Sequence, residues 1–124
     1  MDLVVANKIK KPRYEKLSRL FLLIIYKIME DYKLYYKILR HFKKIIPYNF
    51  SVFRVDMKKL DGDCALIENK FIIRIEKTLP PHSAIDVLIH ELAHILSWET
   101  EKDIHGPNWG KAYSYVYREL LKIT

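Results

Sequence analysis

Two histidines and a glutamate in one short stretch are the residues of this chain best suited to chemistry. His90 and His94 lie four residues apart, and Glu91 directly follows the first of them. In a helix, residues i and i+4 share a face, so both imidazoles can bind one zinc ion at about 2.0–2.1 Å. Glu91 would lie beside that ion and could take a proton from a water that zinc has made acidic. The pattern predicts a zinc hydrolase with Glu91 as general base; the alternative is a helix with two histidines and no metal.

A catalytic zinc site needs a third protein ligand and one open position. His105 is the expected third ligand, because it follows a polar stretch that can turn the chain back and precedes Pro107, which suits the first position of a new helix. Glu101 and Asp103 remain alternatives, since a carboxylate can also complete such a site. One catalytic Zn²⁺ is therefore the expected cofactor.

The segment that carries the first two histidines has the pattern of a helix. Pro80-Pro81 blocks an earlier start, and Ser83 is the expected N-cap. No residue from 84 to 98 breaks a helix. The apolar stripe that would bury it consists of Leu88, Leu92, Ile95 and Leu96. The histidines and the glutamate fall on the flank of this stripe, so we expect them at the edge between core and cleft.

The middle of the chain has the composition of β-strands. Residues 50–58, 64–68 and 71–76 are rich in β-branched and aromatic residues, and Asp61-Gly62 is a turn signal. The simplest arrangement is an antiparallel meander, so we expect an α+β chain with a three-stranded, mainly antiparallel sheet. The strand at 71–76 is the candidate edge for an extended peptide substrate, which would pair with it through main-chain hydrogen bonds.

A last helix is predicted from Pro107 to Lys122, with Trp109 among the residues facing inward. Tyr113 or Tyr117 could turn its hydroxyl toward the cleft and donate a hydrogen bond to the oxyanion of a tetrahedral intermediate. The alternative for both tyrosines is packing in the core.

The N-terminal third is helical in pattern and strongly basic. Residues 1–44 hold twelve Lys/Arg and four Asp/Glu, a net charge of +8, whereas residues 45–124 carry −1. A basic face at helical spacing is formed by Lys33, Lys37, Arg40 and Lys44. It is either a solvated surface or an electrostatic footprint for DNA or another polyanion. A helix buried on more than one face is predicted upstream by the stripe Leu17, Phe21, Ile24 and Ile28.

One resemblance to a known family rests on the histidine pattern. The stretch His90–His94, followed by His105-Gly106-Pro107-Asn108-Trp109, resembles the SprT-like family of zinc metalloproteases, which includes the Spartan proteases. In that family HExxH is followed by a third His in a His-Gly-(Pro)-x-(Phe/Trp) segment. The likeness extends upstream to Asp63-Cys64-Ala65 and the apolar strand 71–75, and covers about residues 50–124.

The resemblance implies a zincin-like fold and a metalloendopeptidase that acts on protein or peptide substrates. It makes His90, His94 and His105 the zinc ligands and Glu91 the catalytic acid/base. Bacterial SprT-type chains carry a Cys-rich zinc ribbon, whereas Cys64 is the only cysteine in these 124 residues. We therefore expect a peptidase core without that ribbon. Two other classes stay open: a zinc hydrolase of a non-peptide amide, and a non-catalytic zinc module that binds nucleic acid through the basic helices.

Length and composition bound the organisation of the chain. The 124 residues fit one domain, with a basic helical part at 1–46, a catalytic core at 50–124, and a junction at Pro47-Tyr48-Asn49. A single cysteine excludes an internal disulfide and fits a cytoplasmic location. The apolar run at 20–25 is too short to cross a bilayer, which takes about 20 residues, so no membrane span is expected.

Overall fold

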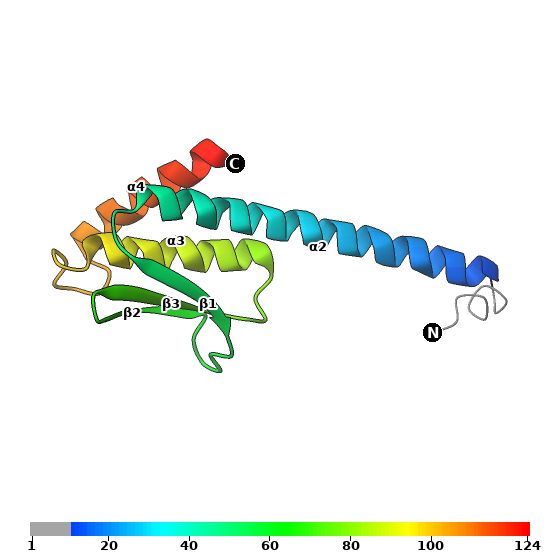
Figure 1. Cartoon of the computed structure of the whole chain (residues 1–124), viewed down its shortest axis with the longest axis horizontal. Helices are drawn as coiled ribbons and strands as arrows, with labels where there is room; N and C mark the ends of the chain where they lie inside the picture. Colours follow the sequence, from blue (N-terminus) through cyan, green and yellow to red (C-terminus); the bar gives the residue numbers. More distant parts are fainter. Residues whose placement is uncertain (1–10) are drawn as a thin grey trace. The chain divides into compact units, whose positions relative to one another are not determined.

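The computed structural model describes residues 11–124, with side chains described from residue 18 onward. The chain is α+β. Its elements in chain order are α2 (Lys11–Ile45), β1 (Phe50–Val55), β2 (Gly62–Ile67), β3 (Lys70–Glu76), α3 (Pro81–Ser97) and α4 (Pro107–Ile123) (Figure 1). The chain divides into two compact units, Met1–Lys33 and Leu34–Thr124, with the boundary inside α2.

The sheet is mixed, with strand order β1-β3-β2. β3 pairs parallel to β1, with Phe50 opposite Phe71, and antiparallel to β2, with Gly62 opposite Ile75. The predicted antiparallel meander is wrong, because it would have placed β2 in the centre. β3 takes the central position instead, and it is the more buried strand: Phe71, Ile73 and Ile75 lie in the core, whereas the second half of β2 is exposed. The β2–β3 turn is made by Glu68 and Asn69, both with positive φ (49° and 65°), as a two-residue hairpin requires.

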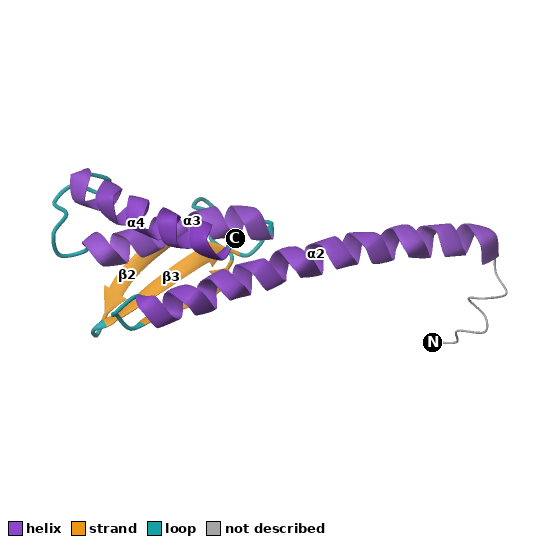
Figure 2. Cartoon of the chain, turned by 90° about the horizontal axis from the view of Figure 1, so that it is seen from above, coloured by secondary structure: helices purple, strands orange, loops and turns teal. Residues whose placement is uncertain are grey.

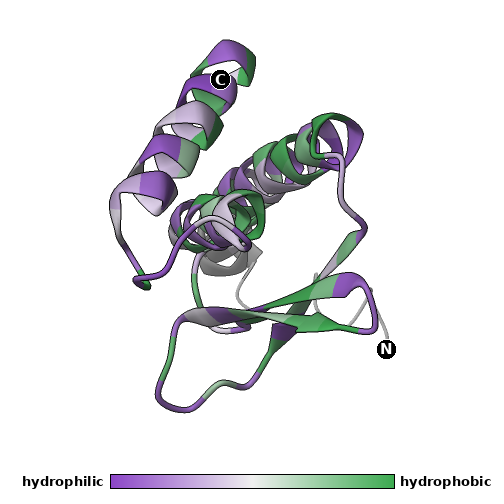
Figure 3. Ribbon diagram, turned by 90° about the vertical axis from the view of Figure 1, so that its left-hand side faces the viewer, coloured by the Kyte–Doolittle hydropathy of each residue, from purple (hydrophilic) through white to green (hydrophobic). Residues whose placement is uncertain are grey.

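Helix α3 lies across one face of the sheet and packs against α4 on its other side (Figure 2, Figure 3). Leu88, Leu92 and Ile95 are buried in the core and Leu96 is partly buried, which confirms the predicted stripe. The C-terminal part of α2 completes the core with Tyr35, Ile38 and Phe42, Ile46 follows directly after the helix, and β3 contributes Phe71, Ile73 and Ile75. The residues of α2 after Lys33 therefore belong to the same core as the sheet.

Helix α3 begins at Pro81, three residues before the start at Ala84 that an N-cap at Ser83 predicts. Pro80 is the N-cap, with extended backbone (φ −65°, ψ 159°), and Pro81 occupies the first turn. Proline is tolerated there because its missing N–H would have had no helical partner. The first helical hydrogen bond runs from the Ala84 N–H to the Pro80 carbonyl at 2.9 Å. The early start extends the rigid helix that carries the histidines.

The N-terminal part of α2 differs from the expectation of separate helices buried on more than one face. A single helix runs from Lys11 to Ile45, because no Gly or Pro interrupts residues 13–45. Leu20, Phe21, Leu22, Leu23 and Ile24 are all about half exposed or more, since the core of the described residues begins only at Tyr35. The Leu17 side chain lies outside the described part. No helix among the described residues is both long and apolar enough to cross a membrane.

Candidate metal centre

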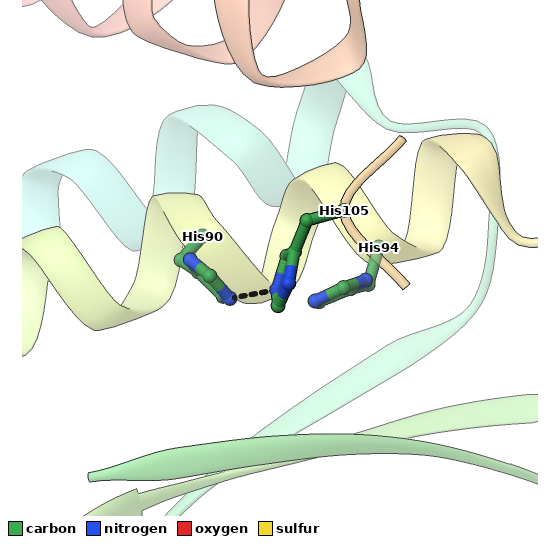
Figure 4. A group of neighbouring side chains, drawn as sticks. All are labelled: His90, His94 and His105. Carbon is green, nitrogen blue, oxygen red and sulfur yellow. Dashed lines mark hydrogen bonds between the residues drawn. The ribbon is translucent and has the colours of Figure 1, made fainter. Parts of the chain in front are cut away.

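The three predicted ligands come together in one cluster (Figure 4). His90 and His94 project from the same side of α3, and His105 reaches them from the loop that connects α3 to α4. The three ring centroids form a nearly equilateral triangle, with separations of 4.9–5.0 Å. One ring nitrogen from each histidine lies within 4.8 Å of the other two, and the Nε2 atoms of His90 and His105 are 3.0 Å apart.

This donor set fits a zinc ion. Tetrahedral zinc with Zn–N distances of about 2.0–2.1 Å holds its nitrogen ligands roughly 3.4 Å apart. The observed spacing needs only small side-chain rotations to reach that geometry. Burial, followed by the neighbouring histidines, lowers the pKa of His94 to about 4, and burial also lowers the pKa of His90. Both rings are therefore neutral at pH 7, with a nitrogen lone pair available for a metal.

Glu91 lies beside the cluster and is buried, with 6% of its surface exposed. Burial raises the pKa of its carboxyl group to about 7, and Asp63 adds to the effect. The start of β2 approaches this carboxylate closely at Gly62. A Cβ built on Gly62 would clash with Cγ1 of Val87 and would lie 3.6 Å from Oε2 of Glu91. The lack of a side chain at residue 62 therefore lets β2 pack directly against the face of α3 that carries Glu91.

The loop that carries His105 is held by Glu101 at the start of α4. The Glu101 carboxylate accepts hydrogen bonds from the N–H groups of Trp109 (3.3 Å) and Lys102 (3.1 Å), and it occupies the space beside Gly106. This carboxylate satisfies an unpaired N–H at the helix N-terminus, where negative charge is favourable. Neither Glu101 nor Asp103, the rival ligands, belongs to the cluster of ring nitrogens. Glu101 acts instead as a brace for the loop.

Trp109 backs the cluster and was expected only as a core residue. Its ring lies 4.8 Å from His105, 4.9 Å from His90 and 5.7 Å from His94, between ring centroids. Its indole N–H donates to the His90 carbonyl at 3.4 Å, and its other side stacks on Tyr113 at 5.1 Å. The sequence signal for this contact was the position of Trp109 in the first turn of the helix that follows His105. Trp109 is a positioning residue for all three imidazoles.

A cavity of about 670 Å³ opens in front of the histidines. Its walls are the start of β2, the exposed side of α3 and the loop at 101–105. Cys64 lines it, but burial raises the pKa of the thiol to about 12, so this cysteine is a poor nucleophile. Tyr113 and Tyr117 do not line this cavity: Tyr113 stacks on Trp109, and Tyr117 is 45% exposed.

The strand beside the cavity is β2, not the predicted strand at 71–76. β3 is hydrogen-bonded on both sides, to β1 and to β2, so it has no free edge to offer. β2 pairs on one side only among the described strands, and its first residues line the cavity. The free strand edge near the site therefore belongs to β2 and not to the predicted strand at 71–76.

The predicted basic face is exposed on α2. Lys33, Lys37, Arg40 and Lys44 are all exposed, on the side of the helix away from the buried Tyr35, Ile38 and Phe42. Lys33 pairs with Glu30 at 3.1 Å, and the other three have no acidic partner within the described part of the chain. Their exposure is compatible with both a solvated surface and a polyanion footprint.

Comparison with known proteins adds no relative. No family model, no curated protein and no solved structure matches this chain.

Proposed function

We propose that this chain is a zinc-dependent metalloprotease in which His90, His94 and His105 hold one Zn²⁺ and Glu91 is the general base. The proposal is supported above all by three imidazoles that converge from a helix and a loop beside a buried carboxylate. A zinc ion held by these three nitrogens would keep one position free for water, as a catalytic site requires, and all three histidines line a cavity of about 670 Å³. A structural zinc would be enclosed by four protein ligands.

The chemistry divides between the metal and the protein. A zinc ion held by His90, His94 and His105 would lower the pKa of a bound water molecule to about 7 and polarise a carbonyl group. Glu91 takes the proton from the attacking water and passes it to the leaving amine, so it serves first as base and then as acid. Trp109 keeps His90 and His105 in place during these steps through its ring contacts and its hydrogen bond to the His90 carbonyl. Such supporting contacts matter because misplaced ligands weaken both metal binding and activity.

A peptide is the substrate class that the strand arrangement favours. An extended polypeptide can add to the free edge of β2 by main-chain hydrogen bonds, which do not depend on side-chain identity. This edge runs into the cavity at Gly62 and Asp63, so a bound chain would pass close to Glu91. The order of HExxH and His-Gly-Pro-Asn-Trp in the sequence supports membership of the SprT-like family as part of the same proposal.

The decisive test replaces Glu91 with Gln. We expect Glu91→Gln to retain one zinc per chain but to lower hydrolysis of an unfolded protein substrate by about 100-fold or more, the usual contribution of a general base. Glu99→Gln is the matched control, because Glu99 is exposed and lies outside the cavity. Full activity in Glu91→Gln, or a zinc ion with four protein ligands, would contradict the proposal. Activity on small amides but not on polypeptides would favour the non-peptide hydrolase.

Polyanion binding is a second candidate function, favoured by the unpaired cations Lys37, Arg40 and Lys44. Binding through such contacts releases counterions, so the affinity for duplex DNA should fall steeply as salt rises. The triple variant Lys37→Gln, Arg40→Gln, Lys44→Gln should lose most of this affinity and flatten its salt dependence. No measurable binding by the unaltered chain at low salt would exclude this function.

A further inference from the structure

A second, smaller cavity of about 280 Å³ lies next to Glu91. Its lining comprises Asp61, Gly62, Asp86, Val87, His90 and Glu91, and we call it the acidic cavity. Gly62, His90 and Glu91 also line the larger cavity in front of the histidines. When a polypeptide binds at the larger cavity, one of its side chains can therefore reach the acidic cavity.

The charge of the acidic cavity is opposite to that of the chain as a whole. The chain carries +7, yet this cavity has three carboxyl groups and no Lys or Arg in its lining. The side chains of Asp61 and Asp86 form no ion pair or hydrogen bond within the described part of the chain. Asp63, one step along β2, is different because Arg74 pairs with it. The acids of this cavity are thus left without an internal counter-ion.

Glu91 is an independent sign that the acidic cavity receives a ligand. It is 94% buried, since 6% of its surface is exposed, and its carboxylate accepts no hydrogen bond from any described residue. A buried polar group without a partner is costly, so such a group usually faces a ligand or water. Glu91 lines both cavities.

A bare metal ion is a poor occupant of the acidic cavity. Within the described residues, the three histidines are the only group of possible ligands close enough together to hold one ion, and no set of these carboxylates qualifies. Carboxylates that are spread around a cavity suit a longer cation instead. A Lys or Arg side chain presents its charge at the end of an apolar stem, which can pack against Gly62 and Val87.

We propose that the acidic cavity is a specificity subsite that accepts a Lys or Arg side chain of an extended polypeptide, next to the bond that is cleaved. The subsite rests on the proposed peptidase function and names its substrate class: polypeptides with basic residues near the reacting bond. Asp61 and Asp86 are the specificity-determining residues, because both carboxylates are unpaired and neither takes part in the hydrolytic chemistry.

The first test measures binding without cleavage. Two labelled extended peptides, identical except that every lysine of one is norleucine in the other, are titrated into the metal-free chain and followed by fluorescence anisotropy. We expect the lysine peptide to bind about fivefold more tightly at low salt, the effect of roughly 1 kcal/mol from partly exposed charge pairs. The preference should shrink at high salt because of screening. The positive charge of the whole chain opposes this preference at long range, so it must arise locally.

Variants assign the preference to the acidic cavity. The double change Asp61→Asn and Asp86→Asn should abolish the difference between the two peptides. Asp56→Asn should preserve it, because Asp56 is an exposed aspartate outside this cavity. Equal affinities for the two peptides, no binding of either, or a preference that survives the double change would each overturn the subsite. The zinc-loaded chain separates the two proposals: a retained lysine preference without hydrolysis would refute the peptidase and leave the cation subsite standing.

Discussion

His105 differs from the other two proposed ligands in how it is held. His90 and His94 are half-buried on a rigid helix, whereas His105 is exposed on a loop. The ring of Trp109 and the carboxylate of Glu101 restrain that loop from the α4 side. Of the three proposed ligands, His105 is therefore the one whose position depends on contacts with α4.

Replacement of His105 should separate metal binding from folding. We expect His105→Ala to keep the fold, because the side chain is exposed, and to lower zinc affinity by at least about 100-fold, since the loss of supporting contacts alone can cost that much. Zinc affinity is measured by competition with a chromophoric chelator, and folding by circular dichroism. His82→Ala is the matched control, because His82 is exposed and outside the cluster. Unchanged affinity in His105→Ala would remove this residue from the site.

At the scale of elements, the turn before α3 is fastened from two strands. Arg54 of β1 donates from Nη2 to the carbonyls of Leu79 (2.7 Å), Lys77 (3.2 Å) and Glu76 (3.3 Å). The Glu76 carboxylate of β3 accepts from the N–H groups of Met57 (2.7 Å) and Thr78 (2.9 Å) and from the Thr78 hydroxyl (2.7 Å). These bonds set where α3 begins, and hence where its histidines lie relative to β2.

The Glu76 bonds predict a pH dependence of stability. Hydrogen bonds from the Met57 N–H and from Thr78 lower the pKa of Glu76 from 4.5 to about 2 in the folded chain. A carboxyl group with a lowered folded pKa stabilises the fold above its unfolded pKa, and this contribution is lost as pH falls from about 4.5 to about 2. Glu76→Gln should therefore unfold more easily than the unaltered chain at pH 7, and the difference should narrow below pH 4.5.

Urea unfolding of both chains across this pH range measures the effect. Glu68→Gln is the matched control, because Glu68 lies exposed in the β2–β3 turn. A gap between Glu76→Gln and the unaltered chain that stays constant with pH would show that the hydrogen bonds do not depend on the charge.

At the scale of the whole molecule, the core and the site belong to one of the two units. Among the residues whose side chains are described, all buried core residues lie between Tyr35 and Val116, within Leu34–Thr124. The other unit exposes large apolar side chains from Leu20 to Met29. Exposed apolar stretches of this kind contribute little to the stability of a fold.

Truncation should therefore be tolerated up to the first core residue. We expect a chain that lacks residues 1–30 to keep one zinc per chain and a melting temperature within a few degrees of the full chain, because no described core contact is lost. A chain that lacks residues 1–39 is the control. It removes Tyr35 and Ile38 and should be strongly destabilised, since the loss of such buried side chains costs about 2–5 kcal/mol each. Thermal melts and zinc titrations measure both properties. If the chain that lacks residues 1–30 were unfolded, the assignment of the core would be contradicted.

Local patterns in the sequence determined the helix that carries His90, Glu91 and His94, its buried stripe and the basic face of α2. Helical periodicity is local, so the sequence alone predicts which residues share a face. His105 was also predicted, because Pro107 signals a new helix after a polar connection.

Only the tertiary structure decided the strand order, the free edge at β2, the brace formed by Glu101, the role of Trp109 and the acidic cavity. Each depends on residues that are distant in sequence. Asp61 and Asp86 line one cavity, for example, only because Gly62 lets β2 approach α3. The exposed apolar stretch of α2 also shows that burial depends on the tertiary structure. Its pattern predicts a buried helix, but burial needs a partner surface, and α2 packs into the described core only from Tyr35 onward.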